Sequence, residues 1–337
     1  MKKEIRIGVI GAGRMGRIHT QNLLKMQEVE VKAIADPRVE DTKKWASSFE
    51  ITDIRSEWRS VLDDPEIDAV VVTAPTKFHF EIIKAAATKG KHIFTEKPLS
   101  HDLESTKELL HFLEGKNVKI QVGFNRRFDH NYRKVKDLIV SDEVGEIHII
   151  KTTTRDPDLP DIEFVKNSGG IFFDFFIHDF DYIRFIANSE VEEVYAGGSV
   201  LWDPKMQEAG DYDTAFVSLK MKSGALGIIN ASRKAIYGYD QRVEVFGSKG
   251  NILTSNDRET NVEVKTKDGI VIDKPLQDFQ HRYIDSFLEE LHDFVKCIIE
   301  DKMPSAKPKD GYEAILIAEA AKISTQFNKP VFIDNLR

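Results

Sequence analysis

Apolar and polar positions follow two different periods along the chain, and the change of period divides it into two regions. Over residues 1–124, short apolar runs alternate with segments whose apolar residues lie three and four positions apart. The runs predict strands at IRIGVI, VEVKAIA, DAVVVTA, KHIFT and VKIQVGF. The segments predict helices in GRMGRIHTQNLLKM, VEDTKKWASSF, HFEIIKAAATKG and LESTKELLHFLEG. This alternation predicts an α/β fold of Rossmann type, with a doubly wound parallel sheet.

The pattern of residues 125–337 is different, because strand-like runs follow one another with little helix between them. We expect strands in VEEVYAGGSVLW, DTAFVSLKMKSG, ALGIINASRKA, RVEVFGSKG, NILTSN and NVEVKTKDG. The turns KSG, SKG and KDG predict hairpins, and therefore a large, mostly antiparallel open sheet. Helices are expected in NYRKVKDLIVSDEVG, from Gly169 to Phe185, and in YIDSFLEELHDFVKCIIED and GYEAILIAEAAKISTQF near the end.

The two regions predict two α/β domains: residues 1–124 as a dinucleotide-binding domain and residues 125–337 as a domain for substrate binding and oligomerisation. The C-terminal helix is free to pack back on the first domain. An open antiparallel sheet has two faces to cover. The helix around Asp174 covers one face, and a second subunit is expected on the other. The sequence therefore predicts a homodimer or homotetramer formed through the C-terminal sheet.

Composition narrows the classes of function. The chain has 337 residues, 31% of them charged, and a formal net charge of −8, so it has no excess of Lys and Arg to neutralise phosphates. A nucleic-acid partner is not expected. No run reaches the roughly 18 apolar residues of a membrane span, and Glu4 and Arg6 interrupt the only candidate for a signal peptide. The single cysteine, Cys297, lies in an apolar run and predicts a core residue. A cytoplasmic protein is expected.

A glycine-rich turn, Gly11-Ala12-Gly13-Arg14-Met15-Gly16, joins the first predicted strand to the first helix. Its glycines permit a tight turn, close approach of a pyrophosphate and close packing of the helix, whose N-terminus attracts the phosphates. Asp36 ends the second strand, where a carboxylate accepts hydrogen bonds from the ribose hydroxyls. The pattern predicts NAD as cofactor. Arg38, two residues further on, leaves use of NADP open.

Two further segments follow strands at the edge of the parallel sheet where ligands bind. TAPTKFH places Thr73, Ala74, Pro75 and His79 beside the expected dinucleotide. The next strand ends in Glu96-Lys97-Pro98, where the ammonium group of Lys97 is able to bond a reacting oxygen. A surface lysine in a turn before proline is the competing interpretation, and spacing alone leaves both open.

GGIFFDFFIHDFDYIRF, from Gly169 to Phe185, places Asp174, His178 and Asp181 on a narrow arc of an otherwise aromatic helix. Such an arc is either a solvated edge or a catalytic acid–base pair. A surface helix normally carries Lys or Glu, and neither occurs between Gly169 and Tyr182. The pattern favours an enclosed crevice. No group of His, Cys and acidic residues has the spacing of metal ligands, so no metal is expected.

Taken together, GAGRMG, EKP at Glu96 to Pro98 and the D-x-x-x-H pattern from Asp174 to His178 resemble the Gfo/Idh/MocA oxidoreductases over essentially the whole chain. The resemblance implies an N-terminal Rossmann domain followed by a C-terminal α/β domain with a mainly antiparallel sheet. It also implies that Lys97, Asp174 and His178 are the catalytic residues.

Within that family, three segments are similar to the inositol dehydrogenases: QVGFNRRFDHNY, YGYDQRVEVFGSKG and HRYIDSFLEEL. This similarity implies NAD-dependent oxidation of a cyclic polyol, with Arg127, Tyr237 and Tyr283 lining its pocket. The chain departs from some of these enzymes at Asp156, where they carry Asn, which puts the stereochemical preference in doubt. Another inositol isomer or a sugar such as glucose remains an alternative substrate. A dinucleotide-sensing regulator without catalysis is the alternative from another class.

Overall fold

The computed structural model describes residues 4–337, and the chain forms two compact units. Unit 1 contains the chain up to Phe128 together with Asp285–Glu313. Unit 2 contains Asp129–Ile284 and Ala314–Arg337. The chain therefore returns to its first unit after most of the second is complete. Among the described residues, no helix is both long and apolar enough to cross a bilayer.

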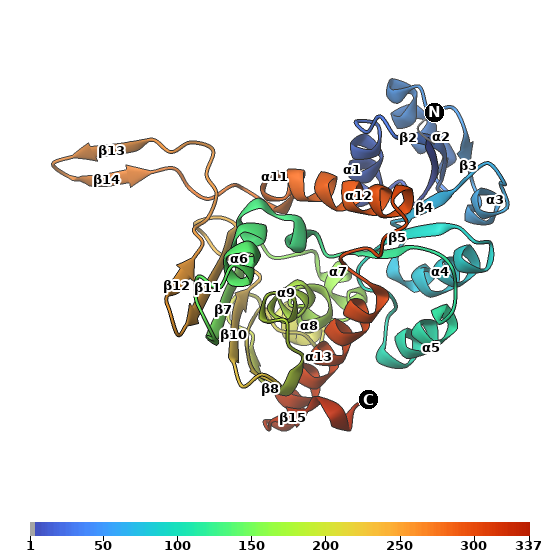
Figure 1. Ribbon diagram of the computed structural model, residues 1–337. Coiled ribbons are helices and arrows are strands. Elements are labelled where there is room, and N and C mark those ends of the chain that lie inside the picture. The colour runs from blue at the N-terminus through green and yellow to red at the C-terminus, as the bar shows by residue number, and fades with distance from the viewer. Residues whose placement is uncertain (1–3) are drawn as a thin grey trace. The chain divides into compact units, whose positions relative to one another are not determined.

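Unit 1 is built on a parallel six-stranded sheet with the strand order β3-β2-β1-β4-β5-β6 (Figure 1). In chain order its elements are β1 (Ile5–Ile10), α1 (Arg14–Leu23), β2 (Val29–Ala35), α2 (Val39–Ala46), β3 (Ile54–Arg55), α3 (Trp58–Leu62), β4 (Ala69–Val72), α4 (His79–Thr88), β5 (His92–Glu96), α5 (Leu103–Leu113) and β6 (Ile120–Gly123), with α12 (Ile284–Ile299) added later. Short 3₁₀ turns lie at Ser47–Phe49, Thr76–Phe78 and Asn125–Phe128. The predicted Rossmann-type sheet is confirmed; β3 and α3 were not predicted.

Both faces of this sheet are covered, as the near-continuous apolar strands require. Ile7 and Val9 of β1 belong to a core cluster that includes Leu23 of α1 and Phe294 of α12. Gly8 lies on the opposite face, where a methyl group would stand 2.3 Å from Val61 of α3. Helices therefore pack on both sides, and α12 completes the core of the first unit.

Unit 2 is built on a seven-stranded sheet with the order β12-β11-β7-β10-β9-β8-β15. Its elements are α6 (His130–Val140), β7 (Ile147–Arg155), α7 (Ile162–Asn167), α8 (Ile171–Asp174), α9 (Ile177–Ala187), β8 (Val191–Ser199), α10 (Lys205–Glu208), β9 (Thr214–Met221), β10 (Leu226–Ser232), β11 (Asp240–Gly247), β12 (Asn251–Leu253), β13 (Glu263–Thr266), β14 (Gly269–Ile272), α11 (Phe279–Arg282), most of α13 (Pro308–Phe327), β15 (Val331–Phe332) and a 3₁₀ turn at Ile333–Asn335. All neighbouring pairs in this sheet are antiparallel except β10 with β7. The predicted, mostly antiparallel sheet is confirmed, although β7 at its centre was not predicted.

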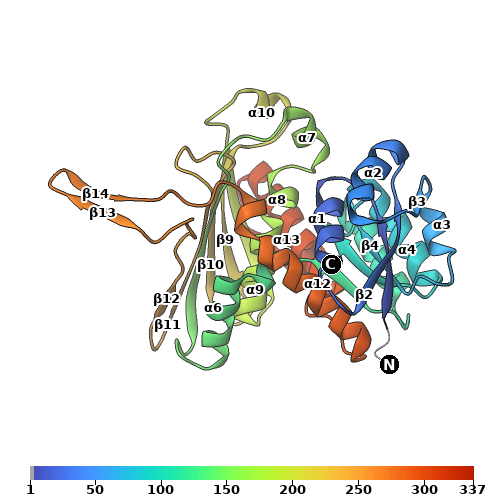
Figure 2. The same cartoon turned by 90° about the horizontal axis from the view of Figure 1, so that it is seen from above.

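The two faces of this sheet have different surroundings. On β10, Gly227 and Ile229 point to the inner face, which α9 covers. On the same face, the hydroxyl of Thr154 of β7 donates a hydrogen bond to the carboxylate of Asp179 of α9 at 2.9 Å. Leu226 and Ile228 point to the outer face and are exposed. Figure 2 shows the helices of this unit gathered on one side of the sheet. The outer face is uncovered in the single chain.

The segment from Gly169 to Phe185 was predicted as one helix, which is wrong. Two helices form instead: α8 ends at Asp174 and α9 begins at Ile177. The amides of Phe175 and Phe176 both bond the carbonyl oxygen of Ile171, at 3.0 Å each, so the helical repeat is interrupted between them. The predicted helix ending at Gly145 also stops earlier, at Val140.

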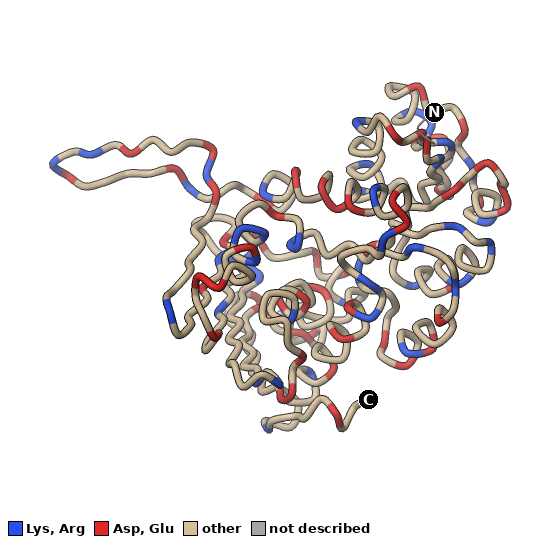
Figure 3. Tube along the Cα trace, viewed as in Figure 1, with Lys and Arg blue, Asp and Glu red and all other residues tan. Residues whose placement is uncertain are grey.

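A hairpin of β13 and β14 extends from this unit apart from its main sheet (Figures 1 and 2). All eight of its strand residues are exposed, including Val264, Ile270 and Val271. Figure 3 shows acidic and basic positions interspersed along the chain, and both kinds occur in this hairpin. The strand residues of the hairpin bury no core; they are joined by the β13–β14 ladder, and Lys265 pairs with Glu263 at 2.9 Å.

Candidate active site

The glycine turn packs closely against the loop that follows β4. Gly11 has φ +103°, and a methyl group there would stand 2.8 Å from the backbone of Ala74 and Thr73. A methyl group on Gly16 would stand 2.0 Å from the carbonyl oxygen of Gly11. These two positions therefore require glycine, one for its conformation and both for close packing. The hydroxyl of Thr73 donates to the carbonyl oxygen of Gly11 at 2.9 Å and fastens the two loops together.

Gly13 differs from these two glycines. A methyl group built on it meets no atom within 4 Å, and as N-cap of α1 it offers no side chain to the first amides of the helix. Arg14 is exposed and Met15 is half-buried at the same helix start. An open backbone at a helix N-terminus is the arrangement that accepts a pyrophosphate. The residues present therefore fit a dinucleotide.

Asp36 lies at the end of β2 and is buried. Its Oδ2 accepts the amide of Ala12 at 2.8 Å, and both its oxygens accept hydrogen bonds from the side chain of Arg38 at 3.1 Å. Burial acts to raise the pKa of Asp36, but the hydrogen bonds from Arg38 and Ala12 outweigh it and hold the pKa below its usual value. Asp36 is thus an anion that fixes the glycine turn and occupies the guanidinium of Arg38. This arrangement places negative charge where a 2′-phosphate of NADP would bind.

His79 begins α4 and is fully buried. Its Nε2 lies 2.7 Å from the carbonyl oxygen of Ala74, and its Nδ1 lies 2.8 Å from that of Pro98. Burial lowers the pKa of this imidazole, against the raising effect of the two carbonyl oxygens. Both ring nitrogens are engaged by backbone, so His79 connects the loop after β4 to the loop after β5.

Glu96 is the last residue of β5 and Lys97 follows it, at the carboxyl end of the parallel sheet. Lys97 is half-buried and is joined to Pro98 by a cis peptide bond. Oε1 of Glu96 lies 2.7 Å from Nε2 of His19 on α1. The side chains of Glu96 and His19 therefore meet within unit 1. Glu96 directly precedes Lys97, the predicted catalytic lysine.

In unit 2, Asp174 is paired with Arg233, whose Nη1 lies 3.4 Å from Oδ2 of the carboxylate. Arg233 is itself fully buried and also approaches Asp211 at 3.4 Å, while Asp211 accepts the amide of Ile171 at 2.9 Å. Sequence reasoning missed Arg233. Its neighbours SRKA gave no signal, because the partners lie far from it in sequence. This ion pair lies beside the start of α9, the helix that carries His178.

Asp181, the third member of the predicted polar arc, has a different surrounding. Only 1% of it is exposed, and its Oδ1 lies 4.0 Å from Nη1 of Arg184, which also pairs with Glu190 at 2.6 Å. Asp181 therefore belongs to a buried internal ion pair. A buried ion pair at Asp181 is neither the solvated edge nor the catalytic acid–base pair that the sequence pattern allows for this arc.

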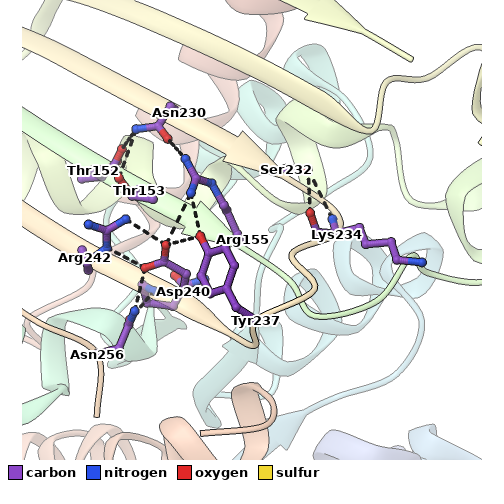
Figure 4. Close-up of polar contacts among 11 residues, drawn as sticks. Thr152, Thr153, Arg155, Asn230, Ser232, Lys234, Tyr237, Asp240, Arg242 and Asn256 are labelled. Atoms are coloured by element: carbon purple, nitrogen blue, oxygen red, sulfur yellow. Dashed lines mark hydrogen bonds and ion pairs between the residues drawn. The ribbon is translucent and has the colours of Figure 1, made fainter. Parts of the chain in front are cut away.

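Tyr237 is 41% exposed, and its hydroxyl is part of a polar network (Figure 4). It donates to Asp240 at 2.7 Å and accepts from Arg155 at 2.6 Å, while Arg242 pairs with Asp240 at 2.6 Å. Burial, followed by the bond to Asp240, raises the pKa of Tyr237. The strand register places Arg155, Asp240 and Arg242 on the outer face of the sheet, opposite the face that α9 covers. None of these three partners was predicted.

The remaining predicted substrate residues lie in different surroundings. Arg127 is buried in unit 1, where it bonds the carbonyl oxygen of Ser305 and pairs with Asp310 at 3.1 Å. Tyr283 is buried in unit 2, with its ring edge-on to that of Tyr239. Asp156 follows the last residue of β7 and is half-buried. The structure places Asp156 and Asp174 in unit 2, and Lys97 and Arg127 in unit 1.

A parallel sheet with a glycine turn, an open helix start and an acid at the end of β2 defines a dinucleotide-binding domain. Known proteins agree. A family profile described as "Oxidoreductase family, NAD-binding Rossmann fold" matches residues 5–124, and the profile of the C-terminal α/β domain of the same family matches residues 136–333. The chain belongs to the Gfo/Idh/MocA oxidoreductase family. The predicted family, fold class and NAD cofactor are confirmed.

Three relatives match along nearly their whole length. An uncharacterised oxidoreductase of Bacillus subtilis is 46% identical over 99% of this chain and 98% of its own. The myo-inositol 2-dehydrogenase of Thermotoga maritima is 42% identical over 98% of this chain and 99% of its own. The solved structure of a scyllo-inositol dehydrogenase from Lactobacillus casei, with NAD(H) and scyllo-inositol bound, has a TM-score of 0.92 at 30% identity, covering 98% of this chain and 100% of that one.

Proposed function

We propose that the chain oxidises one secondary hydroxyl of a cyclic polyol to a ketone with NAD⁺, converting myo-inositol to 2-keto-myo-inositol (scyllo-inosose). The observation that carries this proposal is full-length similarity to inositol dehydrogenases in a chain that has Lys97, Asp174 and His178 in the pattern of the family. A regulator without catalysis would have no use for these three residues together.

The three residues have separate roles in this proposal. His178 takes the proton of the reacting hydroxyl as the carbon–hydrogen bond breaks. Asp174, which pairs with Arg233 at 3.4 Å, orients the imidazole and stabilises its protonated form. Lys97 donates a hydrogen bond to the oxygen as it becomes a carbonyl. Bound NAD⁺ accepts the two electrons and the hydrogen as hydride, so the carbon is oxidised and the proton leaves through His178.

Polyol recognition is assigned to four further residues: Arg127, Asp156, Tyr237 and Tyr283. Asp156 and Tyr237 are proposed to contact ring hydroxyls. For Tyr237 this requires its hydroxyl to leave the bonds to Arg155 and Asp240, which hold it at the outer face of the sheet. Arg127 and Tyr283 are buried, so they are proposed to shape the polyol pocket. A hydroxyl-binding site of this type rejects analogues that lack the hydroxyl, since a buried polar group then loses its partner.

Oxidation of scyllo-inositol is the second candidate, because a relative with 30% identity was solved with scyllo-inositol bound. The substrate consumed separates the two, and not the product, because two inositols that differ at one carbon give the same ketone when that carbon is oxidised. Incubation with myo-inositol and NAD⁺ is expected to give NADH and a ketone two mass units lighter than the substrate, in equal amounts. Formation of a ketone from scyllo-inositol alone would transfer the proposal to that isomer.

The cofactor preference gives a first testable prediction. Replacing Asp36 with serine keeps a short acceptor for the amide of Ala12 but removes the negative charge and frees Arg38. Bonds to charged groups contribute about 1.5–3 kcal/mol, so the ratio of kcat/KM for NAD⁺ over NADP⁺ is expected to fall by about 10- to 100-fold. Initial rates with both cofactors measure this ratio. The matched control is Asp63→Ser, an exposed carboxylate paired with Lys89; an unchanged ratio in the Asp36 variant would remove Asp36 as selector.

The assembly is also proposed: a homo-oligomer formed through the outer face of the unit 2 sheet. Four large apolar side chains are exposed there, on β9, β10 and β11, each between 41% and 48%: Phe216, Leu226, Ile228 and Phe246. Strand register places all four on the same face. Contiguous exposed apolar side chains of this kind mark protein interfaces.

Replacing Ile228 with glutamate is therefore expected to shift the protein to smaller species in light scattering, since a charge would be buried at the interface. Leu24→Glu, an equally exposed position on unit 1, is the control and is expected to change nothing. A wild-type protein that is monomeric at micromolar concentration would contradict the proposed assembly.

A further inference from the structure

Unit 1 contains a buried cluster of titratable groups that the proposed mechanism does not use. His19 of α1, Glu96 at the end of β5 and Glu290 of α12 each have one side-chain nitrogen or oxygen atom within 4.8 Å of the others. His19 and Glu290 are fully buried, and the side chain of Glu96 is 16% exposed. Burying an unpaired charge costs free energy, so three buried ionisable groups must pair their charges or stay uncharged.

Two of the three are fixed by clear contacts. Nε2 of His19 lies 2.7 Å from Oε1 of Glu96, and the imidazole packs edge-on against the rings of Phe94 and Phe287. The other oxygen of Glu96 lies over Gly123 of β6, where a methyl group would stand only 3.2 Å from it. Glu96 therefore has a definite position between α1 and β6.

Glu290 lies on the third side of the cluster. Its carbonyl oxygen accepts the side-chain amide of Gln121 at 2.7 Å, which ties α12 to β6 at this residue. Neither of its carboxyl oxygens has a hydrogen-bond partner among the described residues. Burial, and then the charge of Glu96, raise the pKa of Glu290 well above its usual value. A carboxyl group that keeps its proton is an O–H donor, which a carboxylate is not.

A metal ion is the competing explanation of this cluster. Two ligands bound at about 2.0–2.2 Å with tetrahedral angles stand about 3.3–3.5 Å apart. The His19 to Glu96 separation of 2.7 Å is shorter and is the length of a hydrogen bond. His19 and Glu96 are therefore joined by a hydrogen bond and are not two ligands of one metal ion.

We propose that Glu290 is a positioning residue: its neutral carboxyl group holds a proton beside Glu96 and keeps that side chain, and the adjoining Lys97, in place at the end of β5. The titratable groups facing it are His19 from α1 and Glu96 from β5, and Gln121 from β6 is neutral. When Glu290 loses its proton, two negative charges face one another in a dry site and Glu96 moves away. The effect on turnover rests on the proposed function, in which Lys97 contacts the reacting oxygen.

Stability provides a test that needs no activity. The pKa of Glu290 is raised in the folded state, so its contribution is complete below the ordinary glutamate value of 4.5 and is lost as pH rises toward the folded value. E290Q removes this titration and keeps a neutral donor. The thermal midpoint of E290Q relative to wild type is therefore expected to rise between pH 5 and pH 8 by at least about 2 °C. Glu289→Gln, an exposed carboxyl on the same helix, is the control.

Kinetics test the positioning role. E290A is expected to lower kcat on the order of 10-fold with KM for NAD⁺ within about twofold, because a misplaced catalytic group costs rate and not cofactor affinity. E290Q is expected to restore most of the loss and to abolish the decline of kcat at alkaline pH that is expected of the wild type. A constant midpoint difference across pH, a wild-type pH profile in E290Q, or one equivalent of tightly bound metal by elemental analysis would each overturn the proposal. If no polyol is oxidised, the proposed function fails while the midpoint measurement still decides the state of Glu290.

Discussion

Replacing His178 with alanine is expected to lower kcat by about 100- to 10,000-fold, the usual contribution of a positioned general base. His178 lies on α9 just after Asp174, whose carboxylate is fixed by Arg233 at 3.4 Å. Without the imidazole, the hydroxyl proton has no acceptor as hydride leaves. Initial rates of NADH formation with saturating polyol measure the loss, and the affinity for NAD⁺ is expected to remain within about threefold because the glycine turn is untouched.

A matched control for this variant is His111→Ala. His111 is an exposed histidine on α5, with 86% of its side chain accessible, and it is expected to leave kcat unchanged. Near-normal turnover in His178→Ala would reject its assignment as the base and would transfer that role to another group of unit 2.

Replacing Lys97 with alanine is expected to lower kcat by about 100- to 1,000-fold, the range seen when one donor to a developing charge is removed. The ammonium group stabilises negative charge on the reacting oxygen more than it stabilises the neutral hydroxyl, so the loss appears in kcat and not only in KM. Lys97→Arg is expected to recover little, because a planar guanidinium does not replace a compact ammonium. Lys44→Ala, at an exposed lysine of α2, is the control.

A loss of less than about threefold in Lys97→Ala, with normal protein folding by circular dichroism, would contradict this role. Lys97 would then be the surface lysine before a proline that its sequence spacing also allowed. A loss of cofactor binding without loss of kcat would instead assign the lysine to NAD⁺.

The sequence was sufficient for those parts of the fold and site that depend on local pattern. The strands of unit 1 are short apolar runs, and the glycine turn has its strand before it and its helix after it. Glycine is required at positions 11 and 16 because a side chain on Gly11 would meet the loop after β4, and a side chain on Gly16 would meet the backbone of Gly11. The hairpins of unit 2 follow from their glycine turns in the same way.

Other features depend on contacts between distant segments, which periodicity does not record. β7 was missed because its second half is a threonine run; Thr152, Thr153 and Thr154 are nevertheless buried at the centre of the sheet. The interruption at Phe175 and Phe176 falls within a run of aromatic residues whose spacing would equally suit one continuous helix.

The same limit applies to the candidate site. Arg233 lies 59 residues from Asp174, and His19 lies 77 residues from Glu96. Each looks like an ordinary helix or loop residue in the sequence. The return of α12 to unit 1, which brings Glu290 to this cluster, follows from an apolar helix face that would fit either unit.

The most direct test of the account is the initial rate of NADH formation at 340 nm with the purified protein, NAD⁺ and a panel of myo-inositol, scyllo-inositol, D-chiro-inositol, glucose and xylose, with NADP⁺ run in parallel. The account predicts the highest kcat/KM for myo-inositol with NAD⁺. Absence of turnover across the panel, with NAD⁺ binding intact, would contradict it.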